Sequence, residues 1–134
     1  MDILKKISKL RKEYKMYIPS DYEKFIKKTG CLDYSGSVIK SGKFEIELNH
    51  FLTVDSENPS SDVLRWYSYA KNFRSDYLTF AMGFWNEEFA IKVYGDNLGS
   101  IYYIDQNDDE NIIIEKLFDN FKEFKSQLKP AKWD

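Results

Sequence analysis

The chain has 134 residues, of which 43% are hydrophobic and 31% charged, a size and composition typical of one globular domain with its own core. Its single cysteine and single histidine exclude an internal disulfide and a Cys/His zinc site, and no apolar run approaches the roughly 20 residues that span a bilayer. The net charge of −2 is unevenly placed, because residues 51–115 carry 12 acidic and 4 basic residues while residues 1–50 carry 7 acidic and 11 basic. An acidic centre disfavours nucleic acid and favours a basic protein partner. We therefore expect a single cytoplasmic domain over residues 1–134, without membrane contact.

The first part of the chain predicts two amphipathic helices. In residues 2–16, apolar residues recur every three or four positions with lysines between them, which favours a helix that packs one face on a core. Such a basic helix also suits an anionic membrane, but its apolar side lacks Trp and Phe, so we prefer core packing. A second helix is expected to begin after Pro19, because Ser20 and Glu23 have the spacing of a capping box, and to end at Gly30.

The centre of the chain predicts strands. Apolar and charged residues alternate over 43–48, and the Ser41-Gly42 pair before them indicates a hairpin. A third helix is expected over 63–73, where helical spacing returns. Three further strands are expected, and their short connections imply antiparallel pairing; they cover residues 77–82, 89–94 and 100–105.

The end of the chain predicts a last helix. Apolar residues keep helical spacing from Ile114 to Leu128, and Pro130 follows as a terminator. Helices at both ends and strands between them predict an α+β domain, in which a mostly antiparallel sheet is flanked by N-terminal and C-terminal helices. Ten Phe, ten Tyr and three Trp exceed what one small core needs, so we expect some aromatic side chains to be available to a partner.

Four segments, spread in order over nearly the whole chain, carry a family resemblance. The first is IPSDYEKFI at 18–26, a helix that opens after a proline. Two sheet segments follow, YLTFA at 77–81 and GSIYYID at 99–105, and a closing helix segment, LFDNFKEF, lies at 117–124. In this order they resemble the SUKH superfamily, the Smi/Knr-type domain, and the resemblance implies an α+β fold.

The same resemblance implies a function without catalysis. Bacterial members of the superfamily are mostly immunity proteins, each of which binds and neutralises a cognate secreted toxin domain, often a nuclease, of a polymorphic toxin system. Eukaryotic members look like regulators of the cell wall and of signalling, so a cytosolic regulatory scaffold is the alternative. A hydrolase that depends on carboxylates is a third interpretation. The resemblance implies no cofactor.

The candidate partner-binding residues lie in two acidic segments. An aromatic anchor with a charged rim is the composition of an interface hot spot, and carboxylates speed association with a basic toxin. For Trp85 an indole folded back onto the sheet is an equal alternative to an exposed anchor. The residues selected on these grounds are Trp85, Glu87, Glu88, Asp105, Asp108 and Asp109.

The same acids allow other chemistry. Acid–base hydrolysis needs two carboxyl groups at a defined separation in one cleft, here Glu87 or Glu88 with Asp105. Residues 105–110 offer oxygen ligands for Ca²⁺, although the EF-hand order is absent, and a solvated loop next to a helix N-terminus is the simplest interpretation. His50 lies in no nucleophile motif and is expected at a turn or a sheet edge. We therefore predict no catalytic, metal or cofactor site.

Overall fold

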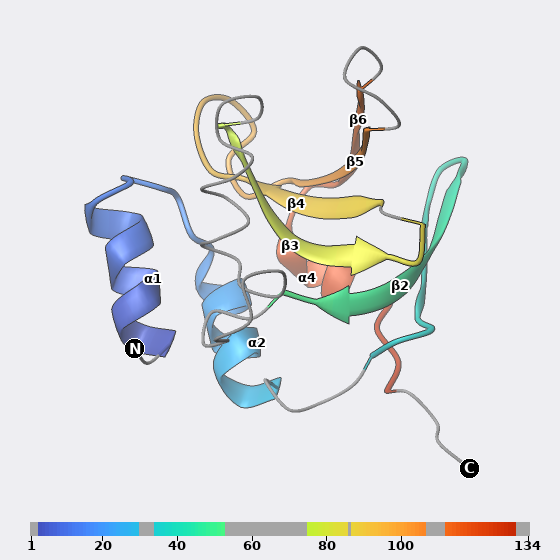
Figure 1. Ribbon diagram of the computed structural model, residues 1–134, viewed down its shortest axis with the longest axis horizontal. Coiled ribbons are helices and arrows are strands. Elements are labelled where there is room, and N and C mark those ends of the chain that lie inside the picture. Colours follow the sequence, from blue (N-terminus) through green and yellow to red (C-terminus); the bar gives the residue numbers. More distant parts are fainter. Residues whose placement is uncertain (1–2, 30–33, 53–74, 86, 107–111, 131–134) are drawn as a thin grey trace.

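The computed structural model describes residues 3–29, 34–52, 75–85, 87–106 and 112–130. Within them, six strands form one antiparallel sheet in which each strand lies beside its neighbour in the chain. The sheet curls, so that the β1–β2 hairpin and the β5–β6 strands both rise above β3 and β4 (Figure 1), and the Ser41 hydroxyl of β1 donates a hydrogen bond to the Leu117 carbonyl of β6. The strands are β1 (Val38–Ser41), β2 (Phe44–Phe51), β3 (Tyr77–Gly83), β4 (Glu88–Lys92), β5 (Ile101–Gln106) and β6 (Ile112–Phe118).

The α+β class and the predicted antiparallel strands are confirmed. The hairpin of β1 and β2 turns at Gly42, whose φ of 58° is the left-handed conformation that glycine adopts without strain. Strands β3, β4 and β5 lie within one or two residues of their predicted ranges. The helix predicted over 63–73 lies outside the described residues.

The two N-terminal helices are also present, as α1 (Ile3–Lys12) and α2 (Ser20–Thr29). The Arg11 guanidinium of α1 lies 3.0 Å from the Glu23 carboxylate of α2, and Lys27 lies 3.4 Å from the same carboxylate. Burial by itself raises the pKa of Glu23, but Arg11 and Lys27 together hold that pKa below its usual value. Glu23 therefore joins the two helices instead of closing the predicted capping box.

The predicted last helix is wrong over its first half. Residues Ile112–Phe118 form β6, which pairs with β5, and α4 spans only Phe121–Lys125. Asn120 caps this short helix, since its Oδ1 accepts a hydrogen bond of 2.9 Å from the Glu123 amide. Three consecutive isoleucines favour a strand, and β5 supplies the partner that helical spacing alone does not reveal. The acids at 105–110 thus precede a strand, and no helix follows them directly.

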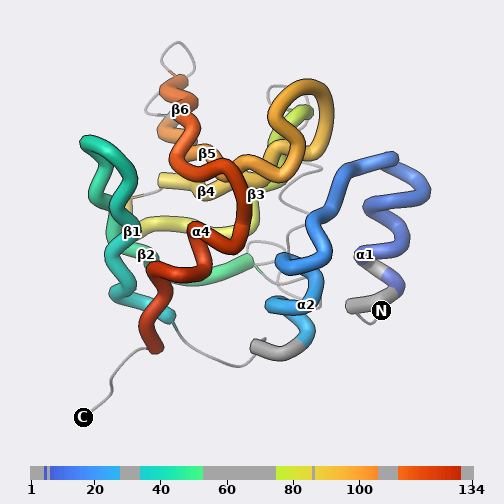
Figure 2. The backbone as a smooth tube through the Cα atoms, turned by 180° about the vertical axis from the view of Figure 1, so that it is seen from behind, coloured from blue at the N-terminus to red at the C-terminus, as the bar shows by residue number. Residues whose placement is uncertain are grey.

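The core lies between helices α2 and α4 and the inner face of the sheet, defined here as the face that these helices cover. Figure 2 shows α4 lying across the middle of the sheet, and Figure 1 shows it on the far side of β3 and β4. Tyr22 of α2 packs edge-on against Phe80 of β3 and Phe121 of α4, with ring centroids 5.8 and 5.4 Å apart. Phe124 packs edge-on against Phe80 at 5.1 Å. These rings are fully buried, so the part of the inner face that α2 and α4 cover forms a continuous aromatic core.

After α4 the chain runs along the outer edge of β1. The Gln127 side chain accepts a hydrogen bond from the Lys40 amide at 2.5 Å and donates one to the Lys40 carbonyl at 2.7 Å. The Ser37 hydroxyl donates to the Lys129 carbonyl at 3.0 Å and accepts from the Lys129 amide at 2.8 Å. The Gln127 bonds satisfy both backbone groups of Lys40 on an edge strand that would otherwise be open to pairing with another chain, and the Ser37 bonds hold the segment after α4 beside that strand.

Candidate partner-binding surface

The turn between β3 and β4 presents two aromatic side chains to solvent. The indole of Trp85 is 84% exposed, and the Phe84 ring is 46% exposed. Trp85 therefore projects from the turn and does not fold back onto the sheet. Large exposed aromatic side chains of this kind are typical of the anchors that fill pockets on a partner protein.

Glu87 braces this turn from within. Its Oε1 accepts a hydrogen bond of 2.6 Å from the Trp85 amide, and its carbonyl accepts one of 2.7 Å from the Gly83 amide. A Cβ atom on Gly83 would lie 2.8 Å from the same Oε1, closer than real contacts allow. Glycine at position 83 is thus what lets the Glu87 carboxylate fold over the turn.

Glu88 is buried, although the sequence analysis selected it as a partner-binding residue. It is the first residue of β4, only 4% of it is exposed, and its Oε1 accepts a hydrogen bond of 2.7 Å from the Thr79 hydroxyl. Glu87 precedes the strand and folds its carboxylate over Gly83, so the side chains of Glu87 and Glu88 diverge although they are neighbours in the chain. A buried carboxylate does not contact a partner protein, so Glu88 is not part of the candidate partner-binding surface.

Asp105 and Glu87 both act on one tyrosine, Tyr103. The Tyr103 hydroxyl donates a hydrogen bond of 2.9 Å to Oδ2 of Asp105, and the Tyr103 ring lies 5.2 Å from that of Phe44. Burial, the hydrogen bond to Asp105 and the negative charges of Asp105 and Glu87 raise the pKa of Tyr103 well above its ordinary value. We call these residues, with the turn, the aromatic end of the sheet; its members are Phe44, Phe84, Trp85, Glu87, Tyr103 and Asp105.

The remaining two candidates, Asp108 and Asp109, lie outside the described residues. The structure therefore places the charges of Glu87 and Asp105 near the same tyrosine, Tyr103, and places Trp85 on the turn that Glu87 closes. Sequence reasoning missed Phe84, Phe44 and Tyr103. Tyr103 could have been selected from the sequence, because residues two apart on a strand share a face and Tyr103 precedes the candidate Asp105 by two positions.

The family comparison bears on this arrangement. The model of the SMI1 / KNR4 family (SUKH-1) matches residues 4–127. The chain belongs to the SMI1/KNR4 family. This family includes immunity proteins and cell-wall regulators, which are generally not catalysts and typically bind partner proteins. No curated protein and no solved structure gives a significant match.

In this member of the SMI1/KNR4 family, the positions of Glu87, Glu88 and Asp105 are unfavourable for an acid–base pair. Glu88 pairs with Ile104 in the β4–β5 register, so Glu88 and Asp105 lie on opposite faces of the sheet. The charge of the Glu87 carboxylate acts on Tyr103, as that of Asp105 does, but this carboxylate is already bonded to the Trp85 amide. Among the described residues, no group of three or more His, Cys, Asp or Glu side chains could hold a metal ion.

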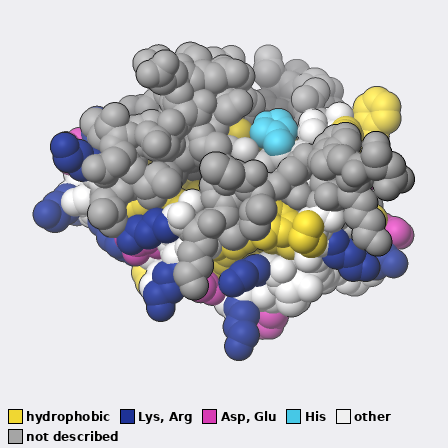
Figure 3. Space-filling view, turned by 90° about the horizontal axis from the view of Figure 1, so that it is seen from below, with side chains coloured by type: hydrophobic (Ala, Val, Ile, Leu, Met, Phe, Trp, Pro, Cys, Tyr) yellow, Lys and Arg dark blue, Asp and Glu magenta, His cyan; other side chains and the backbone are white. Residues whose placement is uncertain are grey.

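His50 lies within β2, opposite Met82 of β3 and beyond the last β1–β2 pair, Val38 with Glu47, so among the described residues it lies on a locally unpaired edge of the strand and not at a turn. Figure 3 shows its imidazole at the molecular surface, on a face where Lys and Arg side chains also project. Partial burial lowers the pKa of His50 from its ordinary value. In the described part of the chain, no helix is long and apolar enough to cross a membrane.

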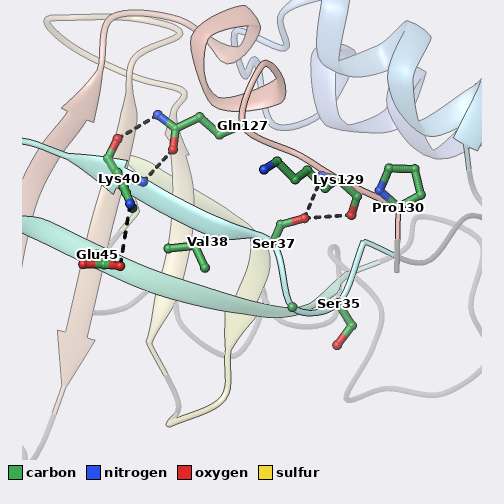
Figure 4. A pocket seen from close by; sticks show the side chains of 9 residues that line it. Ser35, Ser37, Val38, Lys40, Glu45, Gln127, Lys129 and Pro130 are labelled. Carbon is green, nitrogen blue, oxygen red and sulfur yellow. Dashed lines mark hydrogen bonds and ion pairs between the residues drawn. The ribbon is translucent and has the colours of Figure 1, made fainter. Parts of the chain in front are cut away.

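A surface groove also lies beside β1, between the strand and the segment after α4 (Figure 4). Val38 is 40% exposed there, and Lys40 and Glu45 form an open ion pair of 3.9 Å. Two of the polar side chains that line the groove, Ser37 and Gln127, are bonded to the backbone of the chain itself. The groove therefore forms where the segment after α4 packs along the edge of β1. The aromatic end of the sheet is the better candidate for binding a partner.

Proposed function

We propose that this member of the SMI1/KNR4 family is an immunity protein that binds a cognate secreted toxin domain in the cytoplasm and neutralises it without catalysis. The observation that carries the proposal is the exposed indole of Trp85, on a braced turn, within the aromatic end of the sheet. An exposed aromatic anchor surrounded by polar groups is the usual composition of the centre of a protein interface.

The charge of the chain supports a basic toxin. Residues 51–115, which include the β3–β4 turn and Asp105, carry 12 acidic and 4 basic residues. A field of this sign attracts a cationic protein and raises the rate of encounter, an effect that added salt weakens. Asp108 and Asp109 belong to this acidic segment and stay in the proposal as contributors to the field.

Co-expression with the toxin encoded beside the gene tests this function. We expect cells that produce the toxin to survive when the protein is present and to lose that protection when it carries Trp85→Ala. Leu98→Ala is the matched control, since Leu98 is 47% exposed and lies in the turn at the opposite end of β4. Equal killing with and without the wild-type protein would contradict the proposal.

A regulatory scaffold is the second candidate, because the family also includes cell-wall regulators. Such a protein would bind an endogenous partner through the same exposed aromatic side chains and neutralise nothing. The genes that flank the coding sequence distinguish the two. A neighbouring gene for a secreted toxin supports immunity, and an isolated housekeeping locus supports the scaffold.

A further inference from the structure

Glu87 has two possible roles in an acidic, partner-binding turn. A carboxylate can meet a cation on the partner, or it can hold its own turn in the shape that the partner recognises. The contacts of Glu87 favour the second role, because its Oε1 lies 2.6 Å from the Trp85 amide nitrogen and above the space that a side chain on Gly83 would fill. A charge-assisted hydrogen bond of this length is among the stronger bonds that a turn can contain.

We propose that Glu87 is a positioning residue for the Trp85 anchor, and that the toxin meets this turn with an apolar pocket of indole size. The proposal rests on the proposed function and names the chemistry of the partner at that same site. The toxin need not place a cation against Glu87. What it must offer is a concave apolar surface, because the projecting groups of the turn are the rings of Phe84 and Trp85.

The second carboxylate of the aromatic end of the sheet agrees with this assignment. Asp105 accepts a hydrogen bond of 2.9 Å from the Tyr103 hydroxyl, so it too is bonded within the chain. Both described acids of the surface therefore stabilise their own surroundings, while the two largest exposed groups are apolar. The acidic field steers the toxin towards the surface, and the aromatic side chains provide the contact.

Bracing the turn has a thermodynamic consequence for binding. A loop that is already held in its bound conformation loses less conformational entropy when the partner arrives. Removing the brace should therefore weaken binding even though no contact to the toxin is lost. The carboxylate charge itself is dispensable for this role, since an amide oxygen at the same position also accepts a hydrogen bond from the Trp85 amide.

Calorimetric titration of the toxin domain with three variants tests the assignment. We expect Trp85→Ala to weaken binding by about 30-fold or more, as truncation of an anchor does. Glu87→Ala should weaken it by about tenfold, the loss expected when a braced turn becomes mobile. Glu87→Gln should stay within about threefold of wild type, because it keeps the acceptor, and its dependence on salt should fall only slightly, because it removes one of the 12 acidic charges of residues 51–115.

Hydrogen exchange of the Trp85 amide gives a measurement that needs no toxin. This amide should exchange slowly in the wild type and in Glu87→Gln, and faster in Glu87→Ala, at unchanged melting temperature. If Glu87→Gln loses as much affinity as Glu87→Ala while Trp85→Ala also fails to bind, the turn is the interface but Glu87 meets a cation, and the inference is overturned. If Trp85→Ala binds normally, the proposed surface itself is wrong, and the exchange rates still report whether Glu87 holds the turn.

Discussion

The inner face of the sheet has two ends that contain the same kinds of side chain in opposite surroundings. Where α2 and α4 cover it, the rings of Tyr22, Phe80 and Phe121 are fully buried and pack edge-on. At the aromatic end of the sheet, the rings of Phe44 and Tyr103 are half-buried and pack against the border of the core, and the side chain of Trp85 is open to solvent. Aromatic content therefore does not decide what a ring does. The helices that cover the sheet decide whether it stabilises the fold or is available to a partner.

The largest expected effect belongs to the covered end. Phe80→Ala should lower the free energy of unfolding by about 3–5 kcal/mol, because it leaves a cavity among rings that have no access to water. Trp85→Ala should change the same quantity by less than about 0.5 kcal/mol, since its side chain is exposed. Chemical denaturation of both variants measures the contrast. Equal losses of unfolding free energy in the two variants would show that Trp85 is part of the core and would contradict the contrast between the two ends of the sheet.

Thr79→Val tests the buried carboxylate that lies next to the exposed turn in the sequence. It removes the hydroxyl that donates to Glu88, so we expect a loss of about 1–3 kcal/mol in unfolding free energy. Thr79→Ser is the control, because it keeps the hydroxyl and should recover most of the loss. A valine variant as stable as the wild type would mean that this bond contributes nothing to the fold.

Asn120→Ala tests how firmly α4 is held over the covered end. Loss of its hydrogen bond to the Glu123 amide should cost about 1 kcal/mol of stability. Asn120→Asp keeps an acceptor at the same place and should stay close to wild type. Thermal melts of both variants decide this, and a neutral alanine substitution would show that packing of Phe121 and Phe124 holds the helix without its cap.

The smallest expected effect is a pH dependence at the aromatic end of the sheet. The pKa of Tyr103 is raised in the folded state, so its contribution to stability is complete below the unfolded value of 10.0 and falls as pH rises beyond it. Tyr103→Phe should therefore lose less stability than the wild type above about pH 10. Denaturation at neutral and alkaline pH, with an ultraviolet titration of tyrosine, measures this. Parallel losses in the two proteins would show that Tyr103 ionises normally.

Local patterns predicted most of the fold and little of the site. The alternation around 43–48 and the apolar runs of β3 to β5 indicated strands correctly, because each pattern reflects the period of its own element. The prediction of a helix was wrong over β6, because Leu117, Phe118, Phe121 and Phe124 keep helical spacing across the boundary between β6 and α4. All four side chains reach one core, so burial alone does not distinguish a strand followed by a short helix from one long helix.

The sequence by itself determined the α+β class, the antiparallel pairing of the strands and the family, because these depend on short-range periodicity, short connections and ordered motifs. Only the tertiary structure decided which of two adjacent acids is buried. The sheet register turns Glu88 towards Thr79 and leaves Glu87 to fold over Gly83. The amino-acid composition of the turn does not predict this difference between the two glutamates. The exposure of Trp85 was decided in the same way, because an indole is buried or exposed according to which distant segments pack against it.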